Sequence, residues 1–295
     1  MTGTSAASTT SPSSVEVLRY AAFTTDPSGG NPAGVVCEAE GLADADMLAV
    51  AAEVGYSETA FVTDGDPRRR RFRLRYFSPK AEVAFCGHAT VAASVELGRR
   101  LGPGRLDFTT NAGEISVDVT ASGGDVPRAT LTSVPTSSRE AEDAVVDAAL
   151  AALRWSRADL DPRFPPHVAF GGNDHLVLAA ASRERLADLD YDFDALGDLM
   201  RAEGWTTVHL FCPGEPGEFH ARNPFPVGGV VEDAATGAAA AAFGGYLRQL
   251  GYVTAATTYL VHQGEDMGRP SELRVEVDPA DPRVRVSGQA VVIPT

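Results

Sequence analysis

Three side chains of this chain have the chemistry to exchange protons with a substrate. Glu58 stands at the mouth of an expected strand, where partial burial raises the pKa of a carboxyl and makes it a usable acid or base. His88 begins an alanine-rich segment, where a histidine can shuttle a proton or orient a base. Asp233 precedes a second such segment. Each residue also has a structural alternative: a solvated loop glutamate, a polar helix cap and an N-cap aspartate.

The two alanine-rich segments are expected to be helices over residues 88–101 and 236–250. A helix start presents free backbone N–H groups, and Gly87 lets a ligand approach the backbone closely. A small carboxylate could therefore bind at either start without a lysine. If both starts face one cleft, the three acid–base residues surround the bound molecule, which suits proton abstraction and return at carbon. The thiol of Cys86 is either reactive at its helix start or buried, and we favour burial.

The sequence repeats itself, which indicates two similar lobes. Gly29-Gly30-Asn31 recurs as Gly171-Gly172-Asn173. The further repeated residues are Phe72 with Phe219, Arg75 with Arg222, Phe77-Ser78-Pro79 with Phe225-Pro226, Glu82 with Glu232, and Arg99-Arg100-Leu101-Gly102 with Arg248-Gln249-Leu250-Gly251. A tandem of similar lobes creates a cleft between them, where small-molecule sites tend to lie.

Each lobe is predicted to be several strands around one small-residue helix. The strands are expected at residues 15–23, 34–37, 59–63, 70–77, 106–109, 115–120, 129–132, 167–170, 175–180, 208–211, 218–222, 273–277 and 284–293. Further helices are expected at residues 44–54, 140–155 and 193–202. Alanine is a slim helix former, so we favour helices enclosed by curled sheets over helices packed on open sheets.

We expect an α+β protein with an N-terminal lobe of residues 15–137 and a C-terminal lobe of residues 138–295. The last strand is a candidate to return to the first lobe. Residues 1–14 are rich in Ser, Thr and Ala and lack the basic start and apolar core of a signal peptide, so they are predicted to be a disordered tail.

Composition excludes several classes of function. The net charge of −15 argues against nucleic acid and acidic membrane surfaces as partners, and no apolar run is long enough to span a membrane. Residues 68–71 are all arginine, but the alternation that follows favours a strand with arginines on its wet face. Three scattered cysteines do not form a disulfide framework, so a reducing cytoplasm is the simplest compartment.

The sequence also predicts no cofactor and no dedicated metal site. No His-x3-His or Cys-x2-Cys spacing is present, and nucleotide-binding and serine-hydrolase motifs are absent. Lys80 is the only lysine and lies in an expected turn, which makes it a poor Schiff-base residue.

With these motifs, the chain resembles the phenazine-biosynthesis isomerase (PhzF-like) family of the diaminopimelate epimerase-like superfamily. The matching segments cover almost all of residues 15–295: Phe23 to Gly34, Ser57-Glu58-Thr59-Ala60-Phe61, Cys86-Gly87-His88-Ala89-Thr90, Gly228-Gly229 through Glu232-Asp233 to Thr236-Gly237, Gln263-Gly264 and Val286-Ser287-Gly288. The resemblance implies a cofactor-free homodimer in which each chain has two similar lobes, each a barrel-like mixed sheet around a central helix, with the active site between the lobes.

The resemblance also implies residue roles. Glu58 would be the acid and base, supported by His88 and Asp233, and the substrate would be a small carboxylate. The residues assigned to substrate binding are Asn31, Gly87, Ala89, Gly228, Gly229, Thr236, Gly237, Ala238 and Gln263.

Two positions depart from the superfamily and leave the reaction open. Epimerases of the superfamily use two cysteines, but Ala234 stands where the second would be, opposite Cys86. The family usually has proline at position 234 and serine at position 238, and both are alanine here. We therefore expect a proton-moving isomerase, with epimerisation, elimination, a pericyclic reaction or a non-catalytic metabolite-binding role as alternatives.

Overall fold

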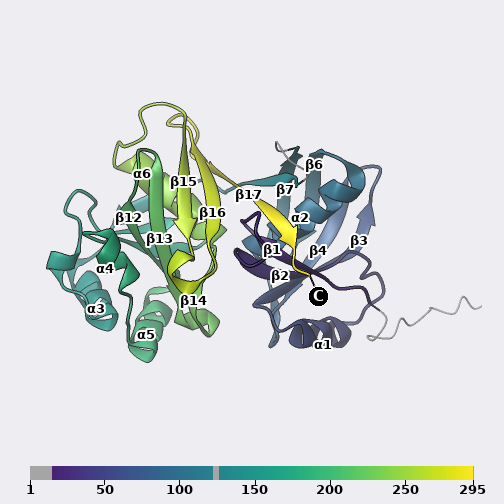
Figure 1. Cartoon of the computed structure of the whole chain (residues 1–295), viewed down its shortest axis with the longest axis horizontal. Coiled ribbons are helices and arrows are strands. Elements are labelled where there is room, and N and C mark those ends of the chain that lie inside the picture. The colour runs from purple at the N-terminus through teal and green to yellow at the C-terminus, as the bar shows by residue number, and fades with distance from the viewer. Residues whose placement is uncertain (1–14, 122–125, 295) are drawn as a thin grey trace, which may run out of the picture.

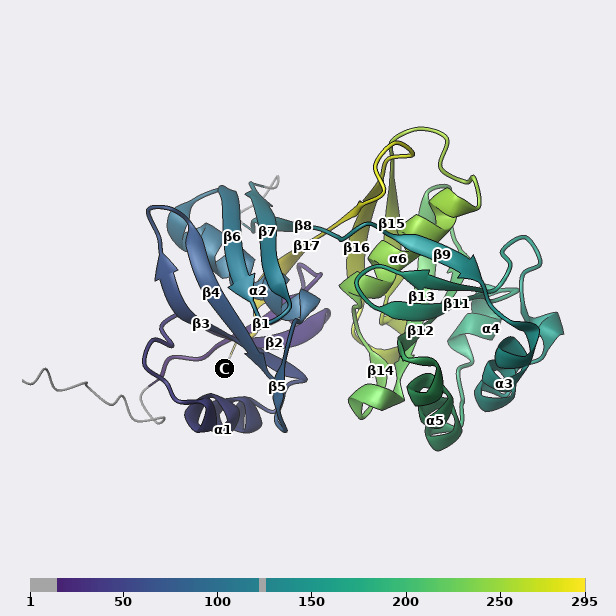
Figure 2. The ribbon, with the colours of Figure 1, turned by 180° about the vertical axis from the view of Figure 1, so that it is seen from behind.

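The computed structural model describes residues 15–121 and 126–294, so the tail expected over residues 1–14 lies outside the described part of the chain. It shows two lobes side by side, each with one central helix (Figure 1; seen from behind in Figure 2). The elements of the first lobe are β1 (Leu18–Ala22), β2 (Asn31–Val36), α1 (Asp44–Val54), β3 (Glu58–Asp66), β4 (Arg71–Phe77), β5 (Glu82–Val83), α2 (Gly87–Leu101), β6 (Gly104–Thr110), β7 (Gly113–Thr120) and β8 (Arg128–Thr132).

The second lobe follows the same plan. Its elements are β9 (Ser137–Glu140), α3 (Asp143–Leu153), η2 (Arg157–Asp159), β10 (His167–Phe170), β11 (Asp174–Ala179), α4 (Arg183–Ala187), α5 (Phe193–Glu203), β12 (Trp205–Pro213), β13 (Glu218–Phe225), η3 (Pro226–Gly228), β14 (Val230–Asp233), α6 (Gly237–Gln249), β15 (Thr257–Gln263), η4 (Glu265–Met267), β16 (Ser271–Val277) and β17 (Val284–Val292).

The sheet of the first lobe closes into a barrel. Hydrogen-bonded neighbours run β1-β2-β3-β4-β6-β7-β8-β17 and return to β1. The pairs β2–β3 and β4–β6 are parallel, and the others are antiparallel. The sheet of the second lobe runs β9-β10-β11-β12-β13-β15-β16-β17, and its parallel pairs β11–β12 and β13–β15 occupy the matching places. The prediction of two similar lobes with mixed, barrel-like sheets is confirmed.

An ion pair marks the repeat in each lobe. Arg75 holds Glu82 through Nε–Oε1 and Nη2–Oε2 bonds of 2.7 and 2.8 Å. Arg222 holds Glu232 in the same two-pronged way, at 3.0 and 2.6 Å. Each pair ties the strand that carries the arginine to the short strand leading into the central helix, so the sequence repeat corresponds to a structural one.

The two central helices are enclosed, as expected from their small residues. Every residue of α2 from His88 to Gly98 is buried, and so is every residue of α6 from Ala239 to Leu247. A Cβ on Gly98 would lie 2.5 Å from Val119 Cγ1. Larger side chains on these faces would push the surrounding strands outward, which is why alanine and glycine fill them.

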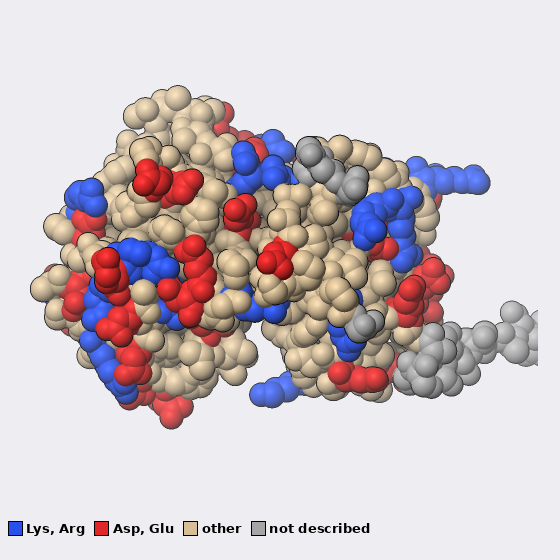
Figure 3. Space-filling view, in the orientation of Figure 1, with Lys and Arg blue, Asp and Glu red and all other residues tan. Residues whose placement is uncertain are grey.

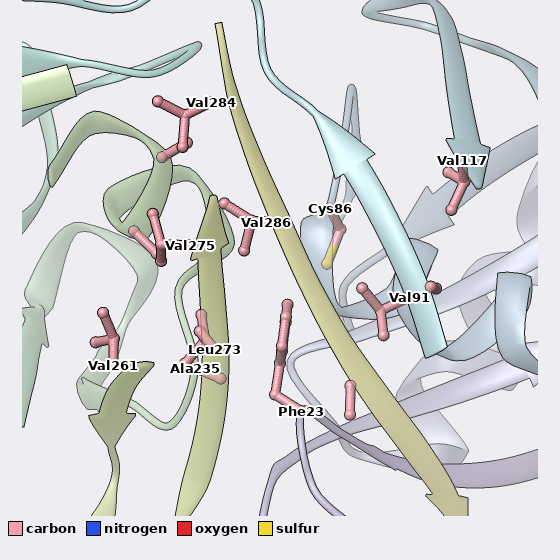
Figure 4. Close-up of a cluster of buried hydrophobic side chains, with 14 of the residues drawn as sticks. Phe23, Cys86, Val91, Val117, Ala235, Val261, Leu273, Val275, Val284 and Val286 are labelled. Carbon is pink, nitrogen blue, oxygen red and sulfur yellow. The ribbon is translucent and has the colours of Figure 1, made fainter. Parts of the chain in front are cut away.

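One hydrophobic core is continuous between the lobes. It includes Val91 and Val117 of the first lobe and Val261 and Val275 of the second, with Phe23 between them (Figure 4). The N–H of Phe23 donates to Gln289 O of β17 at 2.7 Å. β17 itself crosses between the lobes, because it pairs with β16 in one and with β1 and β8 in the other (Figure 1). β17 therefore connects the two sheets through its backbone hydrogen bonds, and Phe23 connects the two lobes through the hydrophobic core.

Some elements differ from the sequence-based expectation. The helix expected over residues 140–155 is shorter, because Glu140 belongs to β9, an unexpected strand that pairs with β10, and Arg154 ends α3 in a left-handed conformation. The strands β5, β14 and β15 and the helix α4 were not expected. In β4 the expected alternation is present, with Phe72 and Leu74 buried and Arg71 exposed. Among the described residues, no helix has the length and apolarity needed to cross a membrane.

Candidate active site

Glu58 meets two residues from the start of α2. It is the first residue of β3, and its Oε2 lies 3.5 Å from Nε2 of His88. The thiol of Cys86 lies 3.5 Å from the same oxygen and 3.4 Å from Nδ1 of His88. Glu58 keeps 18% of its side chain exposed and His88 keeps 8%. The structure thus places Glu58 at the edge of a largely buried acid–base cluster, and not in a solvated loop.

Asp233 lies at the end of β14 and is held by residues from three elements. Asn31 Nδ2, from the first residue of β2, donates to Asp233 Oδ1 at 2.7 Å and to Ala235 O at 3.1 Å. Thr236 Oγ1 donates to Asp233 Oδ2 at 2.6 Å. Gln263 Nε2 donates to the backbone oxygen of Asp233 at 2.7 Å. Four residues proposed from the sequence, Asn31, Asp233, Thr236 and Gln263, therefore form one hydrogen-bonded group.

The two groups act on each other electrostatically. Burial raises the pKa of Asp233, the positive field of His88 and the hydrogen bonds from Thr236 and Asn31 oppose this, and the charge of Glu58 adds to it. Burial also raises the pKa of the Cys86 thiol well above its usual range, with Glu58 the next contributor and Asp233 a smaller one. The cluster from the first lobe and the Asp233 group of the second therefore share one electrostatic environment.

The central helices begin beside these groups. Cys86 occupies the N-cap position of α2 and Thr236 that of α6, so neither His88 nor Asp233 is the N-cap. The N–H of Thr236 donates to Gln263 Oε1 at 3.1 Å, so this donor is already used within the protein and is not available to a ligand. First-turn N–H groups have no acceptor within their own helix. In α2 these groups include Gly87 and Ala89, and in α6 they include Gly237 and Ala238. The Ala89 N–H also interacts with the Cys86 sulfur and lowers the pKa of that thiol.

Two of the proposed substrate-binding residues lie apart from the hydrogen-bonded group. Gly228 ends the short helix η3 and Gly229 follows it in a left-handed turn, both exposed. A Cβ on Gly229 would lie 4.0 Å from Nζ of Lys80, which belongs to the other lobe. The turn thus faces the first lobe at the rim, four residues before Asp233. Figure 3 shows the molecular surface notched between the lobes.

The structure adds two contacts that motif reasoning did not identify. Ser57 Oγ lies 3.4 Å from Nε2 of His88. Cys86 Sγ, His88 and Glu58 also present potential metal-ligand atoms that all lie within 4.8 Å of one another. A search for closely spaced ligand pairs cannot find this cluster, because Glu58 comes from a strand start and the other two residues come from the next helix start. Ala234 is buried and offers no acid or base.

Comparisons of the sequence with known proteins all identify the same family. A family model described as phenazine biosynthesis-like protein matches residues 20–295. The uncharacterized isomerase YddE of Escherichia coli is 32% identical over 288 residues, covering 94% of this chain and 96% of the relative. The trans-2,3-dihydro-3-hydroxyanthranilate isomerase of Pseudomonas fluorescens is 31% identical over 275 residues, covering 92% of this chain and 94% of the relative.

Solved structures agree on the fold. The Bacillus anthracis phenazine biosynthesis protein of the PhzF family superimposes with a TM-score of 0.85 at 23% identity, covering 95% of this chain and 97% of that one. A probable proline racemase from Agrobacterium radiobacter superimposes with a TM-score of 0.63 at 12% identity, covering 94% and 91%. The chain therefore shares its two-lobed fold with these proteins. Sequence identities this low establish a common fold and nothing about the reaction.

Proposed function

The chain belongs to the phenazine biosynthesis-like protein family, and on this premise we propose that it is a cofactor-independent isomerase using Glu58 as both acid and base. Its curated relatives are named isomerases, which makes the chain an isomerase of this family. The finer proposal is that it moves a proton on a small cyclic or conjugated carboxylate. One observation carries it: Glu58 Oε2 and His88 Nε2 lie 3.5 Å apart, and both residues act electrostatically on the partly buried Asp233.

The proposed reaction begins with proton transfer to Glu58. A carbon next to a conjugated carboxylate loses its proton to the Glu58 carboxylate, and the protonated glutamate then returns the proton to a second carbon. A single carboxyl on one side of the substrate can perform both transfers, so the proton stays on one face. His88 Nε2 lies 3.5 Å from Glu58 Oε2. From there it orients the carboxyl group and stabilises it electrostatically as its charge changes during proton transfer.

The substrate carboxylate is proposed to lie between the two helix starts. First-turn N–H groups of α2 and α6 provide donors for an anion without any lysine. Asp233, whose two carboxyl oxygens accept hydrogen bonds from Asn31 and Thr236, is proposed to fix the start of α6 beside the substrate. Ala238 lacks a hydroxyl, so we do not expect the substrate to require a donor at that position.

Two-thiol epimerisation is not supported by this site. Such a reaction needs an acid on each face of the substrate, but Ala234 stands in the place of a second thiol. The remaining thiol, Cys86, is buried, and its pKa is raised well above its usual range. A thiolate is the reactive form, so Cys86 is a poor base.

Proton exchange in D2O tests the proposal. The wild-type chain, Glu58→Gln and the control Glu53→Gln, an exposed glutamate of α1, would be incubated with trans-2,3-dihydro-3-hydroxyanthranilate and related cyclic carboxylates and followed by NMR. We expect exchange or isomerisation with wild type and Glu53→Gln. Removal of a positioned general base typically costs about 100- to 10,000-fold in rate, so Glu58→Gln should show little or none.

Other outcomes would change the assignment. Undiminished turnover in a folded Glu58→Gln variant would exclude Glu58 as the acid and base. Conversion of a substrate without deuterium uptake would favour a pericyclic reaction. Ligands that raise the melting temperature without being converted would favour a metabolite-binding role.

A further inference from the structure

The cluster of Glu58, Cys86 and His88 has the composition and the ligand-atom spacing of a three-ligand metal site. The distances between ligand atoms are 3.5 Å from Glu58 Oε2 to His88 Nε2, 3.5 Å from Glu58 Oε2 to Cys86 Sγ, and 3.8 Å from Cys86 Sγ to His88 Nε2. Tetrahedral Zn²⁺ with bonds of about 2.3 Å to sulfur and about 2.0–2.2 Å to nitrogen and oxygen separates its ligand atoms by roughly 3.3–3.7 Å. The three side chains therefore need little movement to share one ion.

We propose that Cys86 Sγ, His88 Nε2 and Glu58 Oε2 bind a Zn²⁺-like divalent cation, and that the bound ion inhibits the enzyme by occupying Glu58. The binding claim stands on the cluster alone, whereas the inhibition rests on the function proposed above. On binding, the Cys86 S–H bond breaks, its proton passes to solvent, and a sulfur–metal bond forms. His88 coordinates through the lone pair of Nε2 and keeps its proton on Nδ1.

The surroundings favour a cation and leave it one open position. Glu58 retains 18% exposure, so an ion held by these three ligands can keep a water in its fourth position. Asp233 is close enough to interact electrostatically with both Cys86 and His88, and as a carboxylate it would add negative charge beside the ion. Because one ligand is a thiol, the site should prefer Zn²⁺ or Co²⁺ to Mg²⁺ or Ca²⁺, which bind oxygen ligands.

Cobalt provides a direct readout that does not depend on activity. Titration of the metal-free full chain with Co²⁺ should produce a thiolate-to-cobalt charge-transfer band and the visible bands of a tetrahedral ion, saturating at one ion per chain. Zn²⁺ should abolish these bands and Mg²⁺ should not. Absence of a thiolate band in the wild-type chain would overturn the proposal.

Ligand variants locate the site. Changes to partners outside the coordination shell already weaken metal binding by about 10- to 100-fold, so loss of a direct ligand in Cys86→Ser or His88→Gln should weaken it by about 100-fold or more. Cys37→Ser is the matched control, because Cys37 is a free, half-buried thiol of the first lobe, and it should bind as wild type does. A charge-transfer band that survives in Cys86→Ser would place the ion elsewhere and refute the assignment. Circular dichroism of each variant establishes that it is folded, and zinc-dependent melting of His88→Gln provides an independent test.

The two proposals fail separately. Cobalt bands without proton exchange in any substrate would leave the metal site standing and count against the proposed reaction. Proton exchange that Zn²⁺ does not inhibit, in a chain without cobalt bands, would overturn the metal site alone. If both hold, Zn²⁺ should stop exchange and a chelator should restore it.

Discussion

Asn31 donates a hydrogen bond of 2.7 Å to Asp233 across 202 positions of the sequence. The bond joins the start of β2 in the first lobe to the end of β14 in the second. Asn31 is 3% exposed, so water does not readily replace this contact. Asp233 is thus held at the site by residues of both lobes, and its position depends on how the lobes are set against each other.

Replacing Asn31 tests this link. Hydrogen bonds to charged groups contribute about 1.5–3 kcal/mol, so Asn31→Ala should lower the free energy of unfolding by about that amount. Because the Asn31 bond lowers the pKa of Asp233, its loss should raise that pKa further. Urea unfolding and the pH dependence of proton exchange measure the two effects. Asn173→Ala removes an exposed asparagine and should change neither, and an Asn31→Ala variant as stable as wild type would contradict the prediction.

The repeated ion pairs should differ in their contribution to stability. In the Arg222–Glu232 pair the side chains are 10% and 4% exposed, against 19% and 27% in the Arg75–Glu82 pair. Breaking a buried pair leaves an uncompensated charge and costs about 3–5 kcal/mol, whereas exposed pairs are worth about 1 kcal/mol or less. We therefore expect Glu232→Gln to destabilise the chain more than Glu82→Gln. Equal losses in chemical denaturation would show that burial does not separate the two pairs.

The repeat made much of the fold predictable from the sequence. Arg75 with Glu82 and Arg222 with Glu232 recur at similar spacing, and both form the same contact in the structure. The alanine-rich helices were predictable because a slim helix is needed inside a curled sheet. The short strands β5 and β14 were not, because two to four residues carry too little periodicity. The strand β9 was not predicted, and its last residue, Glu140, was assigned to helix, because pairing with β10, a non-local contact, decides its conformation.

The site was predictable in its parts but not in its connections. The motifs placed Glu58, His88 and Asp233 at the ends of elements, where the structure has them. Spacing could not show that Asn31 bonds Asp233 or that Cys86 contacts Glu58, because both contacts cross between elements that are distant in the sequence. Gly228 and Gly229, which were grouped with the site because they precede Asp233 in the motif, lie in an exposed turn at its rim.

The close approach of α2 to the barrel wall predicts a specific steric defect. A Cβ at position 98 would lie 2.5 Å from Val119 Cγ1, so Gly98→Ala should destabilise the chain despite alanine's better helix propensity. Overpacking typically costs about 1–3 kcal/mol. Val119→Ala removes the opposing methyl groups, so the double variant should lose less stability than the sum of the two single variants. Additive losses in this double-mutant cycle would show that the two residues do not collide.

Two histidines inside the second lobe should make the chain sensitive to acid. Burial lowers the pKa of His175 to about 3, with His209 adding to the effect, and burial lowers the pKa of His209 to about 4. Both side chains are fully buried, and His175 Nδ1 lies 2.8 Å from Thr207 Oγ1. In the unfolded chain a histidine titrates near about 6.5. Below that pH these histidines bind protons in the unfolded state but stay neutral in the folded state. Their contribution to the free energy of unfolding is therefore fully present above about pH 6.5 and decreases as the pH falls toward about 4.

Urea unfolding between about pH 7 and about pH 5 measures this dependence. His209→Gln removes one titrating group and should therefore reduce the slope of unfolding free energy against pH. Thr207→Val is the matched control, because it removes a hydrogen-bonding partner of His175 without removing a titrating group. It should lower stability at every pH and leave the slope close to that of wild type. A wild-type slope in His209→Gln would mean that other groups cause the loss of stability in acid.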